Sequence, residues 1–168
     1  MTINFLIAVE DLKQLGLINE NVDTKIIKYT IQTVQDINVQ TATGTPLYKE
    51  LLRRVEENDW NAAYTKLMEE YIAMVIVSHC NVRIVGHLNN KITNKATGSV
   101  SDENLQANAA QVNNSYKSQL RKDADFYTER LIGYLKDNAE IYPEYNDNEC
   151  NHENVKKSKG GFNTWVKV

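Results

Sequence analysis

The amino-acid sequence predicts a mainly helical protein, a bundle of about four to five helices. Three observations lead to this prediction. Apolar residues recur at steps of three and four over most of the chain, which is the spacing of one helix face. The 168 residues include only 7 Gly and 2 Pro, so few positions interrupt a helix. Hydrophobic residues make up 42% and charged residues 24%, the balance of a globular domain with a buried core.

The N-terminal part predicts an extended segment followed by two helices. Residues 3–7 are expected to form a strand or an extended arm, with about one turn of helix at 9–15. A longer helix is expected to begin at Asp23, a favourable N-cap, and to end at Gly44. Its inner face is predicted to consist of Ile26, Ile27, Ile31, Val34 and Ile37.

Two further helices are predicted between residues 45 and 88. The first begins at Thr45-Pro46, because the missing N–H of Pro would be unpaired at that position anyway. Charged residues end it, and Asn58 or Asp59 is expected to cap the next helix. That helix, 60–88, is predicted to be long and central, because most of its sides become apolar after Tyr71. The inner faces are predicted to be Leu47, Leu51, Leu52 and Val55, then Tyr64, Leu67, Tyr71, Met74 and Val75.

Helical spacing stops at residues 89–100, where strand-compatible and turn residues predict a projecting β-hairpin or ordered loop. A long C-terminal helix is then expected from Ser101, extending roughly 50 Å and allowing one break near Asn113-Asn114. This length exceeds the diameter of a domain of this size, so part of the helix is expected to pack on a neighbouring subunit. Its inner face is predicted to be Leu105, Ala109, Val112, Tyr116, Leu120, Ala124, Tyr127, Leu131 and Tyr134.

Pro143 ends the helical region, so the sequence predicts one helical domain over residues 1–145 and an extended arm over 146–168. Phe162 and Trp165 follow Gly160-Gly161, a pattern typical of an arm that docks elsewhere. The arm aromatics and the hairpin are therefore predicted to contact other subunits or a partner protein. The predicted interface residues are Lys91, Ile92, Thr93, Asn94, Lys95, Phe162 and Trp165.

No membrane association is expected. The N-terminus lacks the basic region and small-residue cleavage site of a signal peptide. The most apolar run, residues 71–88, carries five polar side chains that would be costly in a bilayer. These are Ser78, His79, Asn81, Arg83 and His87. The chain is expected to be made in the cytoplasm.

Few residues are spaced for catalysis or metal binding. A zinc site would need four ligands that meet, and the candidates fall in two distant groups: His79, Cys80 and His87, then Cys150 and His152. The favoured interpretation is a buried cysteine and helical histidines with local partners, without metal or cofactor. Glu56-Glu57 and Glu69-Glu70 could be acid–base pairs, but paired acids on a helix usually form a solvated face. No enzyme is predicted.

Lys117, Arg121 and Lys122 form a short basic patch that could face DNA in a channel. A solvated helix face is the favoured alternative. The net charge of -3 gives no overall basic excess of the kind that indicates nucleic-acid binding.

An ordered set of motifs over about residues 4–145 resembles the head-to-tail connector (ring, or adaptor) proteins of tailed phages, of the type found in crAss-like phages. Related sequences often carry Pro in the long helix, whereas Ala73-Met74 continues without one. In chain order the motifs are Asn21-Val22-Asp23, Gln35-Asp36-Ile37, Gly44-Thr45-Pro46-Leu47-Tyr48, Tyr71-Ile72-Ala73, Lys91-Ile92-Thr93-Asn94-Lys95, Ala124-Asp125-Phe126-Tyr127, Arg130-Leu131, Tyr134-Leu135 and Tyr142-Pro143-Glu144-Tyr145.

The resemblance implies a virion structural protein without catalytic residues. Such proteins form a ring, typically of about twelve subunits, by heterologous contacts that close by rotation. The ring lies beneath the portal, joins the capsid to the tail and forms part of the DNA conduit. Expected partners are other copies of the chain, the portal, further connector or tail proteins, and transiently DNA. A helical nucleic-acid-binding or regulatory phage protein is the alternative, and an enzyme that uses the His79 region is a third hypothesis.

Overall fold

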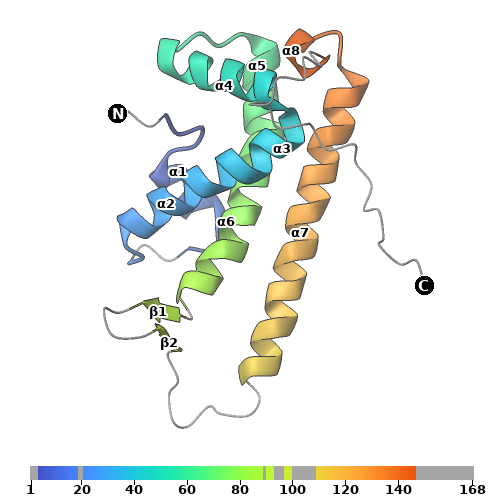
Figure 1. Cartoon of the computed structure of the whole chain (residues 1–168). Coiled ribbons are helices and arrows are strands. Elements are labelled where there is room, and N and C mark those ends of the chain that lie inside the picture. The colour runs from blue at the N-terminus through green and yellow to red at the C-terminus, as the bar shows by residue number, and fades with distance from the viewer. Residues whose placement is uncertain (1–3, 19–20, 89, 93–96, 100–108, 147–168) are drawn as a thin grey trace, which may run out of the picture.

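A computed structural model describes residues 4–18, 21–88, 90–92, 97–99 and 109–146, and this part of the chain is mainly helical, as predicted (Figure 1). The central helix α6 (Ala73–Leu88) packs along α7 (Ala109–Asp137) and α2 (Thr24–Val34). Helices α4, α5 and α8 gather at one end of the α6–α7 pair (Figure 1). No helix of the described residues is long and apolar enough to cross a membrane.

The first long helix has the predicted start and end. It consists of α2, a π-helical turn η1 (Gln35–Val39) and α3 (Gln40–Thr43). Asp23 caps it, because its Oδ1 accepts the N–H of Lys25 at 2.9 Å. Gly44 ends it with φ 79°, a backbone conformation that glycine adopts without steric cost.

The π-helical turn shifts the buried face by one position. A π-helical turn holds one residue more than an α-helical turn, so the α-helical spacing fails beyond it. Ile27, Ile31 and Val34 are buried as predicted, before or at the start of the turn. Ile37 was expected inside, but it is 51% exposed, and Val39 is buried instead.

The next helix, α4 (Thr45–Glu57), starts at Thr45-Pro46 as predicted and buries Leu47 and Leu51. The predicted cap of the following helix was wrong. Asn58 adopts a left-handed conformation, φ 52°, which closes α4. Asn61 therefore caps α5 (Ala62–Leu67), with its Oδ1 accepting the N–H of Tyr64 at 3.0 Å.

The predicted helix 60–88 is continuous over residues 62–88, with a second π-helical turn, η2 (Met68–Ile72), between α5 and α6. The same one-residue shift occurs here. Val75 is fully buried as predicted. Tyr71 and Met74 were also expected inside but are only half-buried, and Ile72 and Ile76 are fully buried instead. Residues 75–78 are all buried, so the expectation of a central helix enclosed on most sides is confirmed.

Helix α7 runs without the break expected near Asn113-Asn114, since asparagine lowers helix stability only slightly. Leu120, Ala124 and Leu131 are buried as predicted. Tyr116 was expected inside but is 45% exposed, because the buried face of the described part of α7 begins at Leu120. The predicted helical residues 101–108 lie outside the described part.

An extended N-terminal segment precedes α1 (Val9–Leu15), and two buried amides rather than a described strand fix the chain on either side of that helix. The Oε1 of Gln35 accepts the N–H of Leu6 at 3.1 Å, and its Nε2 donates to the carbonyl of Asn4 at 3.0 Å. The Oδ1 of Asn81 accepts the N–H of Leu17 at 3.0 Å. Gln35 of η1 thus holds the segment before α1, and Asn81 of α6 holds the residues that follow α1.

Two short strands follow α6, at the end opposite α4, α5 and α8 (Figure 1). β1 (Asn90–Ile92) pairs antiparallel with β2 (Thr97–Ser99), with Asn90 opposite Ser99 and Ile92 opposite Thr97. Residues 93–96 lie outside the described part. The same holds for the predicted arm from residue 147 onward.

Candidate functional site

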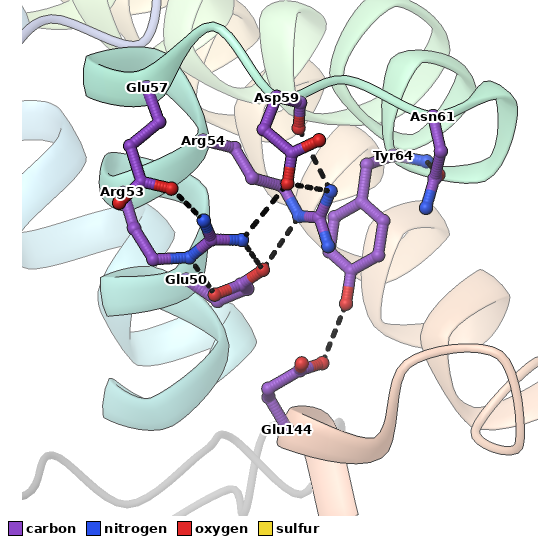
Figure 2. Close-up of polar contacts among 8 residues, drawn as sticks. All are labelled: Glu50, Arg53, Arg54, Glu57, Asp59, Asn61, Tyr64 and Glu144. Atoms are coloured by element: carbon purple, nitrogen blue, oxygen red, sulfur yellow. Dashed lines mark hydrogen bonds and ion pairs between the residues drawn. The ribbon is translucent and has the colours of Figure 1, made fainter.

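A polar cluster joins α4, α5 and α8 (Pro143–Asn146) at one end of the bundle (Figure 2). At its centre the guanidinium of Arg54 lies 3.7 Å from the ring centroid of Tyr64 and 2.8 Å from Oε1 of Glu50. The Arg54 and Glu50 side chains are only 11% and 16% exposed. Removal of either partner would leave the other charge shielded from water, which costs more than losing a surface ion pair.

Arg53 extends this cluster toward solvent. Its guanidinium pairs with Glu50, Glu57 and Asp59, and its side chain is 40% exposed. Exposed pairs of this kind stabilise a fold little, because water and salt screen them. Their effect is local: the hydrogen bond from Arg53, followed by the charge of Arg54, lowers the pKa of Glu50.

Tyr64 connects this cluster to α8. Its hydroxyl donates to Oε2 of Glu144 at 2.6 Å, a contact between residues 80 positions apart. Burial raises the pKa of Tyr64, and the hydrogen bond to Glu144 adds to this effect. The hydroxyl therefore stays protonated and acts as a donor near neutral pH.

Tyr142 fastens the chain between α7 and α8 onto α5. Its ring is fully buried and meets Tyr64 edge to face at a centroid distance of 5.3 Å. Its hydroxyl donates to the carbonyl of Ala63 at 3.0 Å, so the 3.1 Å hydrogen bond with Tyr134 is donated by Tyr134. One hydroxyl thus joins α5 and α7.

The aromatic contacts continue down the bundle. Tyr134 of α7 stacks on Tyr71 of η2 at a centroid distance of 4.0 Å, and Arg130 lies 4.9 Å from the Tyr71 ring centroid. We call Tyr64, Tyr71, Tyr134 and Tyr142 the tyrosine cluster. It joins α5, η2, α7 and the segment before α8 (Figure 1), and it provides a rigid clamp rather than a nucleophile.

Helical spacing had predicted an inward position for three of these four tyrosines. Tyr142 was not predicted as a site residue. The one sequence signal for Tyr142 was its position directly before Pro143, after the end of the long C-terminal helix. The contacts of Tyr142 with Ala63 and Tyr64 bridge nearly 80 positions, and no local pattern reports such a distance.

The structure describes only part of the predicted interface. Lys91 and Ile92 belong to β1, next to the end of α6. Thr93, Asn94 and Lys95 lie outside the described residues, as do Phe162 and Trp165 of the arm. The predicted interface therefore stays a prediction.

The three basic residues of α7 do not share one face. Lys117 and Arg121 are one turn apart on the same side, whereas Lys122 points about 100° away from Arg121. Lys117 is half-buried, and Arg121 and Lys122 are exposed. Asp123 and Asp125 follow directly, so the exposed surface there carries both signs of charge.

His79 has a hydrogen-bond partner on α7, and Cys80 is buried, whereas the His87 side chain lies outside the described part. Thr128 donates its hydroxyl proton to the carbonyl of Ala124 at 2.8 Å, so it accepts from Nε2 of His79 at 3.0 Å. Burial lowers the pKa of His79, and burial raises the pKa of the Cys80 thiol to about 12. A thiol that stays protonated is a poor nucleophile, because the thiolate is the reactive form.

Other candidate groups are scattered. No group of three metal-ligating side chains occurs among the described residues. Cys150 and His152 lie outside them. Glu56, Glu57, Glu69 and Glu70 are all exposed, as expected for a solvated face.

The described part of the chain is thus a helical bundle in which tyrosines fasten α7 and α8 to α5 and η2. The chain belongs to a family of unknown function, DUF6712, whose family model matches residues 39–155. This range includes the whole tyrosine cluster. Searches of curated proteins and of solved structures gave no significant match.

Proposed function

We propose that this chain is a structural subunit of a tailed-phage virion, forming a ring in the head-to-tail connector beneath the portal. In this role it joins the capsid to the tail and lines part of the DNA conduit. Its partners are other copies of the chain, the portal and further connector or tail proteins.

The observation that carries this proposal is that motifs separated in the sequence meet in the structure. Tyr71 stacks on Tyr134, and Arg130 covers the Tyr71 ring. Asp36 accepts a 2.5 Å hydrogen bond from the hydroxyl of Tyr48. These five residues all belong to the motifs that carry the connector resemblance. The resemblance therefore involves residues that hold this fold together, and this supports the proposal.

The shape of the bundle also supports the proposal. The β1–β2 pair lies at the end of α6 remote from the tyrosine cluster (Figure 1). Tyr142 and Glu144, which closely precede the predicted arm in the sequence, are held at the opposite end of the bundle. Contact elements at two separated places suit a heterologous ring, in which one face meets a different face of the next subunit.

The charge distribution supports a conduit better than a DNA-binding domain. A strongly basic lumen would hold DNA by many phosphate contacts and slow its passage. The chain has a net charge of -3, and Arg121 and Lys122 are followed by two acids on α7. Weak contact with DNA is the expected behaviour.

The experiment is to mix the purified chain with the portal of the same phage and to image the product by electron microscopy. Rings stacked on the portal are expected. In parallel, DNA binding is titrated against salt with the wild type and a K117Q/R121Q/K122Q variant. Tight, salt-dependent DNA binding that the variant loses, without any ring, would instead support the nucleic-acid-binding alternative.

A further inference from the structure

The outer face of α7 carries an apolar side chain and an open position two turns apart. Phe126 is 61% exposed, although it lies in the middle of a helix whose opposite side is buried. Gly133 follows seven residues later and therefore lies on the same face, about 10 Å along the axis. A Cβ built on Gly133 would meet no atom within 4 Å.

Neither feature is needed by the described fold. Glycine lowers the stability of a helix interior relative to alanine, and the open space beside Gly133 would accept a larger side chain. Phe126 contacts Tyr127 edge to face but leaves most of its surface in water, so burying it in a partner would be favourable. A partner that approaches closely at Gly133 and covers Phe126 would explain both residues.

We propose that this partner is a second copy of the chain, whose α7 packs antiparallel on the first. If the two helices cross between residues 129 and 130, Phe126 of each copy faces Gly133 of the other. Each phenylalanine then fills the space left by a glycine, as a knob fits a hole in paired helices. The pairing is two-fold and occurs about 5 Å on either side of the crossing point.

The charges on the same face agree with this register. Antiparallel pairing about that point places Lys122 opposite Asp137, and the pair occurs twice by symmetry. Both residues are exposed. Lys122 and Asp137 have no partner in the described structure, so pairing would compensate both without breaking an existing contact.

This inference concerns the free chain and does not depend on the connector role. A two-fold pair differs from the heterologous contacts of a ring, so it would form before assembly and separate when the ring forms. Ring formation on the portal and pairing in its absence can thus succeed or fail independently.

The test is the concentration dependence of the mass of the full chain, measured by analytical ultracentrifugation, for the wild type and two variants. The wild type should be a reversible dimer. Gly133→Leu should raise the thermal midpoint, because leucine is a better helix former, yet weaken the dimer about tenfold or more by filling the hole. Phe126→Ala should weaken the dimer to a similar extent without unfolding the chain.

A charge exchange tests the register. Lys122→Glu and Asp137→Lys should each weaken the dimer several-fold, and the double variant should recover most of the loss. A wild type that stays monomeric at all concentrations would overturn the inference. A dimer that Gly133→Leu does not weaken, or one that the double charge variant does not restore, would also overturn it. Dimers that form only after residues 147–168 are removed would overturn it too, because the arm would then cover this face of α7.

Discussion

The hydroxyl of Tyr142 offers the sharpest test of the clamp at the end of the bundle. Tyr142→Phe keeps the buried ring and removes two hydrogen bonds, one to the carbonyl of Ala63 and one from Tyr134. Each bond contributes about 0.5–1.5 kcal/mol net, and Tyr134 is only half-buried and can turn to water. We therefore expect the free energy of unfolding to fall by about 1–3 kcal/mol.

The assay is urea unfolding followed by circular dichroism, together with a thermal scan. A loss of about 2 kcal/mol lowers the thermal midpoint of a protein of this size by about 4–8 °C. Tyr116→Phe is the matched control, because Tyr116 is 45% exposed and should change the free energy by less than about 0.5 kcal/mol. Equal, negligible effects of both substitutions would refute the reasoning that Tyr142 clamps α7 and α8 to α5.

Three further predictions concern the proposed contact elements and pH. Deleting residues 159–168 should leave helicity and the thermal midpoint unchanged but weaken assembly with the portal, and an unfolded truncated chain would place the arm in the core. Ile92→Asp should reduce assembly more than monomer stability, and an equal loss of both would place β1 inside the domain. Burial lowers the pKa of His79 below its unfolded value of about 6.5, so its contribution to stability is present above that pH and is lost as the pH falls toward the folded pKa. Unfolding measured between about pH 7.5 and 5 should thus show a weaker pH dependence for His79→Gln than for the wild type, and identical profiles would contradict the assignment.

The sequence was sufficient where a structural signal is local. Asp23 and Gly44 gave both ends of the first long helix, and Pro46 marked the start of α4. Capping and φ preferences depend on a few neighbouring atoms, so the residue type carries the information. The wrong cap at Asn58 has the same local origin, since asparagine also favours the left-handed end of a helix.

The sequence was insufficient where one residue changes the helical period. Helical periodicity predicted a buried Ile37 and did not include Val39 in the buried face. In the structure Ile37 is exposed and Val39 is buried, because the turn of η1 contains an extra residue. The shift to Ile72 after η2 has the same cause. The local residue types do not indicate a π-helical turn, because tertiary packing compensates for the altered backbone hydrogen bonds of that turn.

The candidate site was predictable only as a tendency. Inward tyrosines followed from helical spacing, but the contacts of Tyr64 with Glu144 and of Tyr71 with Tyr134 join segments more than 60 positions apart. Such pairs depend on how helices align in space, which a single sequence does not encode in any short window. The predicted interface at residues 91–95, 162 and 165 remains a prediction.

The mass of the purified chain in solution, alone and then with the portal of the same phage, tests the connector proposal most directly. We predict a closed oligomer of about twelve copies on the portal, formed from free chain that is a smaller species before it is recruited. A stable monomer or dimer that ignores the portal and binds DNA in a salt-dependent manner would contradict the proposal.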